Sequence, residues 1–160
     1  MCILFLEILR QAEEGLRIYR DSRIEAMLSL CHWAMGSIHL DLSDLANAGT
    51  SMEEALRLSR KNNEKGYEGL ALVGLGRVFG MRQPRRTEQA EECFSKGLAI
   101  LRDLKMKPYY SQGRMFLGEL YLDVGEKEKA MENLKKAEVM FHEMGMEYWL
   151  DRTHKLLEKI

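Results

Sequence analysis

The stretch MFLGELYLDVGEKEKAMENLKKAEVMF, residues 115–141, places small residues at fixed intervals among charged ones. The chain contains this arrangement three times, as a glycine followed by two further small residues: Gly36, Ala48 and Ala55; Gly76, Ala90 and Gly97; Gly118, Ala130 and Ala137. The three glycines are 40 and then 42 residues apart. A fixed period of this length is the signature of stacked supersecondary units.

Larger apolar residues keep the same register. Met35, Leu75 and Leu117 precede the glycines, and Met52, Phe94 and Leu134 fall between the two small residues that follow. Glycine inside a helix costs about 0.5 to 1 kcal/mol relative to alanine, so matched glycines indicate a packing requirement. We expect Gly36, Gly76 and Gly118 to mark the point where the first helix of each pair closely approaches the second.

Composition favours an all-α fold in one domain. The 160 residues are 46% apolar and 31% charged, and they include two prolines. The net charge of -1, from 24 basic and 25 acidic side chains, predicts no nucleic-acid partner. The first apolar run, CILFL, is too short for a signal peptide or a membrane span, and three cysteines without a CxxC pair suit reduced thiols. We therefore expect a cytoplasmic protein with no membrane partner.

The best copy of the pattern, Leu117, Gly118, Tyr121, Ala130, Leu134 and Ala137, resembles the tetratricopeptide repeat. The period exceeds the usual 34 residues of that family, and Arg114, Leu72 and His32 stand where its tryptophan is expected. Long repeats of this kind are similar to the C-terminal arrays of bacterial and archaeal signalling ATPases, transcription activators and adenylate-cyclase fusions. The resemblance implies a right-handed helical-repeat solenoid of about eight antiparallel helices in four pairs.

The expected helices are 3–20, 22–41, 44–62, 65–81, 87–104, 109–124, 127–144 and 147–160. Residues 1–20 would hold the second helix of a truncated repeat; 22–62, 65–104 and 109–144 would be full repeats; and 147–160 would be a C-terminal capping helix. Ser43-Asp44 is a candidate N-cap, Pro108 suits the first turn of a helix, and Gly125 suits a left-handed helix end.

The resemblance also implies a concave groove lined by the first helix of each pair, where the family binds peptides. Carried onto this chain, the partner-binding groove consists of Trp33, Ser37, Asp41, Val73, Arg77, Met81, Gln112, Met115, Glu119 and Asp123, to which the last helix would add Arg152, Lys155 and Lys159. Trp33 is either an exposed anchor for the partner or a buried core residue. The Lys and Asn residues with which chaperone-binding members hold a C-terminal carboxylate are missing.

Several other features of the sequence suit a structural role better than a site. The column Met27, Tyr67, Tyr109 and Trp149 is interpreted as packing between repeats. Arg82, Arg85 and Arg86, near Arg77, are interpreted as a solvated loop between helices; the alternative is a site for a phosphate or an acidic peptide. Cys31, His32 and His39 lack the spacing of a metal site. With no nucleophile and base in a recognisable motif, we expect neither an enzyme nor a cofactor.

The sequence therefore predicts a non-catalytic module that binds a peptide or protein segment in its groove, within a larger signalling or regulatory protein. One alternative is self-association through an open N-terminal end at Ile3, Leu4 and Phe5, giving a homodimer. The other alternative is a sensor whose groove holds a small molecule.

Overall fold

The computed structural model describes residues 7, 10–15, 17–18 and 27–160. This part of the chain is helical throughout and contains no strand, so the predicted all-α class is confirmed. From residue 27 onward the helices are α2 (Leu28–Asp41), α3 (Leu45–Lys61), α4 (Lys65–Met81), α5 (Thr87–Asp103), α6 (Lys107–Asp123), α7 (Lys127–Glu143) and α8 (Glu147–Leu157). None of the described helices is both long and apolar enough to cross a membrane.

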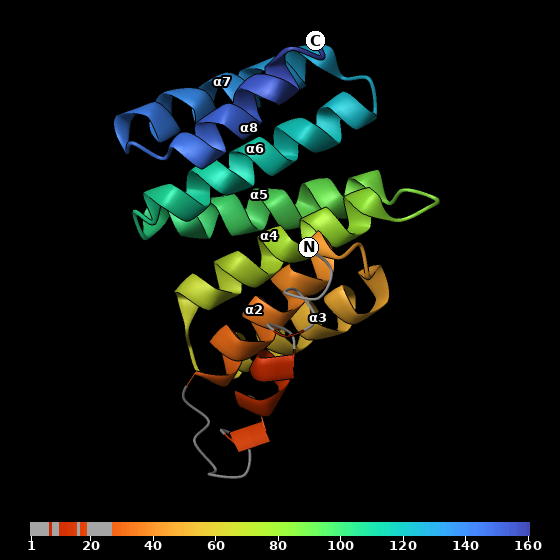
Figure 1. Cartoon of the computed structure of the whole chain (residues 1–160), viewed down its shortest axis with the longest axis vertical. Helices are drawn as coiled ribbons and strands as arrows, with labels where there is room; N and C mark the ends of the chain where they lie inside the picture. The colour runs from red at the N-terminus through yellow and green to blue at the C-terminus, as the bar shows by residue number, and fades with distance from the viewer. Residues whose placement is uncertain (1–6, 8–9, 16, 19–26) are drawn as a thin grey trace.

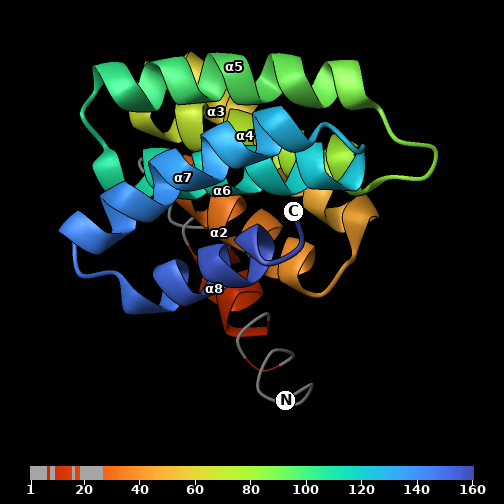
Figure 2. The same cartoon turned by 90° about the horizontal axis from the view of Figure 1, so that it is seen from above.

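The helices stack as antiparallel neighbours in an elongated array (Figure 1). Each helix packs against the next one in the chain, and α2, α4, α6 and α8 also pack against one another in that order. These four helices form one side of the solenoid, and α3 and α5 lie on the other side (Figure 2). The predicted helical-repeat solenoid is therefore confirmed.

One turn design connects most of the helices. The middle residue of the turn has a positive φ angle at Ser43, Asn63, Lys105, Gly125 and Gly145. The backbone N–H of the next residue donates a hydrogen bond of 2.7–3.0 Å to the carbonyl five residues earlier, which satisfies an acceptor at the helix end. The predicted left-handed conformation of Gly125 is confirmed by its φ of 82°.

The predicted starts of two helices have a clear local cause. Asp44 is the N-cap of α3, where its carboxylate accepts a 3.2 Å hydrogen bond from the backbone N–H of Asn47. Pro108 lies in the first turn of α6, which begins at Lys107, two residues before the predicted start. Proline is tolerated there because its missing N–H has no partner inside the helix.

The matched glycines lie where the sequence places them, against the apolar residue of the following helix. A Cβ atom on Gly36 would be 2.9 Å from Cγ of Met52, one on Gly76 would be 2.8 Å from the Phe94 ring, and one on Gly118 would be 2.7 Å from Cγ of Leu134. Real Cβ atoms essentially never approach other atoms so closely, so a larger residue at these positions would force the facing side chain to shift. The predicted close approach within each pair is confirmed.

Candidate functional site

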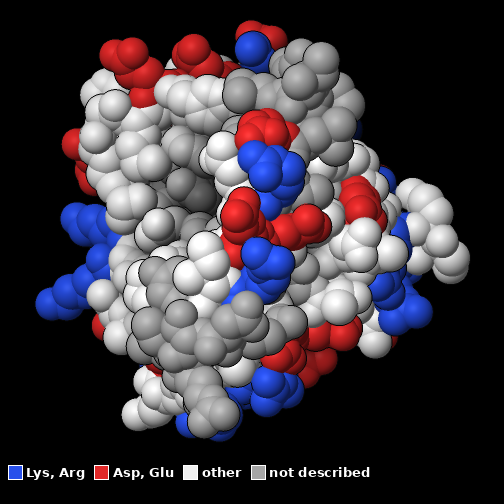
Figure 3. All heavy atoms as spheres, turned by 60° about the horizontal axis from the view of Figure 1, so that its bottom comes forward, with Lys and Arg blue, Asp and Glu red and all other residues white. Residues whose placement is uncertain are grey.

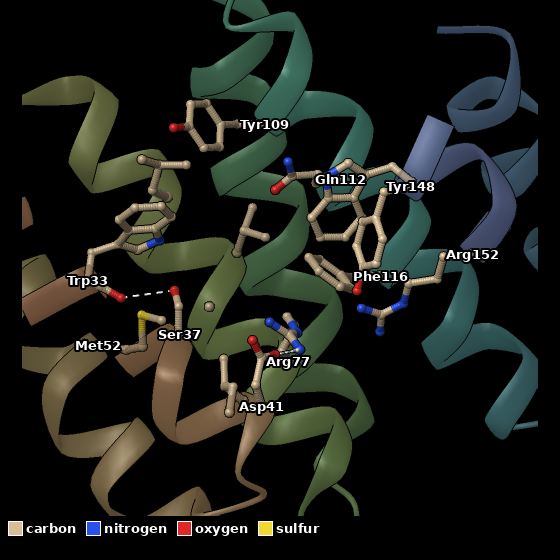
Figure 4. A pocket seen from close by; sticks show the side chains of 15 residues that line it. Trp33, Ser37, Asp41, Met52, Arg77, Tyr109, Gln112, Phe116, Tyr148 and Arg152 are labelled. Carbon is tan, nitrogen blue, oxygen red and sulfur yellow. Dashed lines mark hydrogen bonds and ion pairs between the residues drawn. The ribbon is translucent and has the colours of Figure 1, made fainter. Parts of the chain in front are cut away.

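A pocket of about 470 Å³ opens along α2, α4, α6 and α8 (Figure 4). Its volume lies within the range of about 300 to 1,000 Å³ that is typical of ligand sites. Five of its lining residues are aromatic and three are charged: Trp33, Tyr109, Phe116, Tyr148 and Trp149; Asp41, Arg77 and Arg152. All four helices of this side of the solenoid contribute to it.

The structure brings most of the predicted groove residues to this region. Trp33, Ser37, Asp41, Val73, Arg77 and Gln112 line the pocket. Met81, Glu119 and Asp123 line a smaller hollow of about 200 Å³ that shares Arg77, Phe116 and Arg152 with it. The predicted groove is thus one region with two adjoining hollows.

Met115 is the residue of the predicted groove that the structure corrects. Its side chain is 0% exposed and belongs to the main apolar core, so no partner can touch it. The next residue, Phe116, lines the pocket instead. Because consecutive helical residues point about 100° apart, an error of one residue exchanges a groove position for a core position.

Trp33 combines the two roles that the sequence left as alternatives. It is half-buried and packs against both apolar clusters of the protein, yet it also lines the pocket. Its ring meets that of Tyr109 edge-on at 5.9 Å between centroids. Ser37 donates a 2.9 Å hydrogen bond to the Trp33 carbonyl, which keeps the hydroxyl on the helix (Figure 4). Trp33 is therefore held in place before any partner arrives.

The aromatic column was interpreted as packing alone, and that interpretation is incomplete. Tyr109 and Trp149 do pack against the main core, but each also presents part of its ring to the pocket. Tyr148, which the sequence analysis missed, lines the same pocket with 71% of its surface exposed. Trp149 matches equivalent residues in the other repeats, whereas Tyr148 does not. The only sequence feature that could have identified Tyr148 is its position next to Trp149.

Arg77 lies at the floor of the pocket. Its side chain is only 15% exposed, its Cζ atom is 4.0 Å from the centroid of the Phe116 ring, and its Nη2 is 3.5 Å from Oδ1 of Asp41. Burial lowers the pKa of Arg77, and the nearby Arg152 lowers it further, while Asp41 and Glu119 act in the opposite direction. The guanidinium is thus a buried charge whose neighbours compensate it incompletely.

Arg152 approaches the same ring from α8. Its Cζ atom is 5.3 Å from the Phe116 centroid and 5.8 Å from that of Trp149, and its Nη2 is 3.3 Å from Oε2 of Glu119. Figure 4 shows both arginine side chains directed toward Phe116. Lys155 and Lys159, also predicted on this helix, do not line either hollow.

The loop between α4 and α5 is tied to the fold through Arg85. This side chain donates hydrogen bonds to the Gly80 carbonyl at 3.0 Å, to the Asp123 carbonyl at 2.6 Å and to Oδ2 of Asp123 at 2.9 Å. The interpretation of the loop as simply solvated is therefore wrong for Arg85. The Asp123 carboxylate, predicted to face a partner, holds this loop.

Three further predictions concern metal binding, surface charge and the N-terminal residues. Among the described residues, no group of three or more His, Cys, Asp or Glu side chains is placed to hold a metal ion. Nδ1 of His39 lies 3.3 Å from Oδ2 of Asp44. Acidic and basic side chains alternate on the face shown in Figure 3. Ile3, Leu4 and Phe5 lie outside the described residues.

Comparison with known proteins agrees with the geometry. Residues 31–62 and 111–138 match the family model of the tetratricopeptide repeat; these segments cover most of α2 with α3, and most of α6 with the first part of α7. These two segments are therefore similar to tetratricopeptide repeats, which agrees with the resemblance seen in the sequence. No curated protein matches it. Tetratricopeptide repeats generally mediate protein–protein interaction, and the proteins that contain them are typically non-catalytic scaffolds.

Proposed function

We propose that this protein is an interaction module that binds a segment of a partner protein in the pocket along α2, α4, α6 and α8. The observation that carries this proposal is the pocket itself, in which four successive helices of one side contribute aromatic and arginine side chains to a single surface. Tryptophan, tyrosine and arginine are the residues most enriched at energetic hot spots of protein interfaces. This composition favours a binding surface for a partner.

Rigidity supports the same function. The rings of Trp149 and Phe116 meet edge-on at 6.0 Å, and Trp149 stacks on the core residue Phe141 at 6.1 Å. Rings held in this way lose little conformational freedom on binding, which lowers the entropic cost of association. Tyr148, which is 71% exposed, lines the pocket and presents its ring to a bound segment.

The test replaces Tyr148 with the photocrosslinker benzoylphenylalanine and irradiates the protein in cells of its source. We expect a discrete crosslinked partner that is lost when Arg152 is also changed to Gln. The matched control carries the same crosslinker at Leu104, which is exposed but does not line the pocket. Crosslinks that are identical from both positions, or that ignore the Arg152→Gln change, would show that this pocket is not the partner-binding site.

The two alternative functions stay predictions. Self-association through Ile3, Leu4 and Phe5 concerns residues outside the described part of the chain. A small-molecule sensor is compatible with the pocket volume of about 470 Å³, and a ligand-dependent rise in melting temperature of the purified protein would favour it over a peptide-binding module.

A further inference from the structure

Two arginines from different helices converge on one aromatic ring, and each has a single long contact with an acid. Arg77 from α4 and Arg152 from α8 both lie over Phe116 of α6, at 4.0 and 5.3 Å. Their distances to the nearest carboxylate oxygens are 3.5 Å to Asp41 and 3.3 Å to Glu119. Charge-assisted hydrogen bonds of this kind are normally about 2.7 to 2.9 Å long. Both ion pairs are therefore loose.

Several other ion pairs of the same protein are shorter. Lys65 lies 2.7 Å from Glu68, Arg60 lies 3.0 Å from the same carboxylate, and Arg85 lies 2.9 Å from Asp123. Pairs as long as the two in the pocket also occur away from it, since Lys129 lies 3.5 Å from Glu126, so length alone does not set the pocket pairs apart. The pocket arginines differ from the others in that both lie over the same ring, Phe116, and line the same pocket, where a carboxylate of a ligand could replace their long contacts.

Arg77 is the more buried of the two arginines, because its side chain is only 15% exposed. A guanidinium has five N–H donors, and the contact of Arg77 with Asp41, at 3.5 Å, engages one of its nitrogens. Asp41, the acid that pairs with Arg77, has a side chain that is 53% exposed, so this carboxylate is stable in water and easily displaced. The lowered pKa of Arg77 has burial as its main cause, and a further anion beside it would favour the charged form.

We infer that the partner segment bound in this pocket carries a carboxylate side chain next to an aromatic or large apolar one, and that Arg77 and Arg152 hold this carboxylate beside Phe116. The inference rests on the proposed function, because it specifies the chemistry of the same partner. The arginine forks suit bidentate pairing with a carboxylate. The aromatic walls at Trp33, Tyr109 and Trp149 suit the adjoining ring or apolar chain.

The same geometry disfavours a basic segment at this point. A lysine or arginine of a partner would come to lie beside two guanidinium groups that share one ring. Like charges placed together at an interface oppose binding. Asp41 and Glu119 would then remain paired with the arginines, and the partner's cation would gain no new acidic partner.

The first experiment selects binders from a random dodecapeptide phage library on the purified full chain, with Tyr148→Ala protein as the counter-selection. We expect enriched peptides to share an Asp or Glu next to, or one residue removed from, an aromatic or large apolar residue. Enriched peptides that depend on Tyr148 but lack an acid would overturn this inference and leave the proposed function standing. Failure to enrich any peptide that depends on the pocket would count against both.

The second experiment measures the affinity of one enriched peptide and of its acid-to-amide version. On the parent protein, we expect the amide peptide to bind about tenfold more weakly than the acidic peptide. On Arg152→Gln protein, we expect the two peptides to bind with nearly equal affinity. Asp41→Asn should bind the acidic peptide more tightly, because a competing carboxylate is removed. The inference would be overturned if the acid-to-amide change reduced the affinity equally for the parent and for Arg152→Gln protein. Weaker binding of the acidic peptide by Asp41→Asn protein would also overturn it.

The control variant is Arg102→Gln. Arg102 lies on α5, outside both hollows, and pairs with Asp103 at 2.9 Å. This change removes the same charge from the protein, so it shows how much of the effect comes from net charge alone. Thermal unfolding of every variant ensures that only folded proteins are compared.

Discussion

At the scale of single residues, the repeats are similar but not interchangeable. Ala55, Gly97 and Ala137 occupy the same column, and both alanines are completely buried. A Cβ atom on Gly97 would lie 2.8 Å from the backbone carbonyl oxygen of Gly69 and 3.0 Å from Cγ2 of Val73. The glycine therefore lets α5 approach the backbone of α4 so closely that a methyl group does not fit.

Gly97→Ala should for this reason destabilise the protein. Overpacking costs about 1 to 3 kcal/mol, and the better helix propensity of alanine returns at most about 1 kcal/mol. We expect the free energy of unfolding to fall by about 1 to 2 kcal/mol, measured by urea denaturation.

The control for this prediction is Gly66→Ala. There a Cβ would meet the end of the flexible Met106 side chain, at 3.3 Å from its sulfur. This variant should be close to neutral or slightly more stable. Equal destabilisation by both variants would contradict the role assigned to the α4 backbone.

At the scale of elements, the Arg85 side chain joins its own loop to two helices. Arg85, in the loop between α4 and α5, bonds to the last turn of α4 through Gly80 and to the end of α6 through Asp123. The carbonyls at a helix end lack partners inside the helix, and a cation is favourable there. This loop is longer than the other turns, so it depends on the side chain for its position.

Arg85→Gln should lower the free energy of unfolding by about 1 to 2 kcal/mol, because it removes charge-assisted hydrogen bonds to two helices. Arg86→Gln changes the neighbouring residue, whose side chain is exposed, and should cost less than about 0.5 kcal/mol. Chemical denaturation of the two variants side by side measures the difference. A loss of the same size in both would mean that Arg85 does not anchor the loop.

At the scale of the whole molecule, the described part has two apolar clusters of unequal size. The smaller one has five buried residues, Leu40, Ala48, Met52, Leu75 and Val78, and joins α2 and α3 to α4. The larger one has fourteen buried residues and extends from α4 to α8. In a solenoid each repeat is stabilised mainly by its neighbours, so stability follows the local cluster.

We expect hydrogen exchange to be faster in α2 and α3 than in α5, α6 and α7. Helices that bury less apolar surface open at lower free energy, without unfolding of the rest. Exchange followed by mass spectrometry on peptides from each helix measures this gradient. Uniform protection across α2 to α7 would show that the solenoid unfolds as one cooperative unit.

Prediction from sequence worked best where a contact depends on nearby residues. The glycine columns at Gly36, Gly76 and Gly118 identified the close approaches within helix pairs, since the residues concerned are separated by one turn and part of a helix. Trp33 and Arg77 were placed in the groove by the resemblance to the tetratricopeptide repeat. Met115 was misplaced and Phe116 missed because the groove positions were carried over from the family, and a shift of one residue on a helix that packs against both α4 and α7 exchanges a pocket position for a core position.

The sequence by itself determined the repeat, the helices and the turns, because these follow from small residues at fixed spacing and from local backbone chemistry. Only the tertiary structure decided that Arg77 and Arg152 meet on Phe116. These residues belong to three different helices, and nothing in their local pattern links them. Their distances depend on how the rotation between successive repeats accumulates along the solenoid, which is a property of the packed array and of no single repeat.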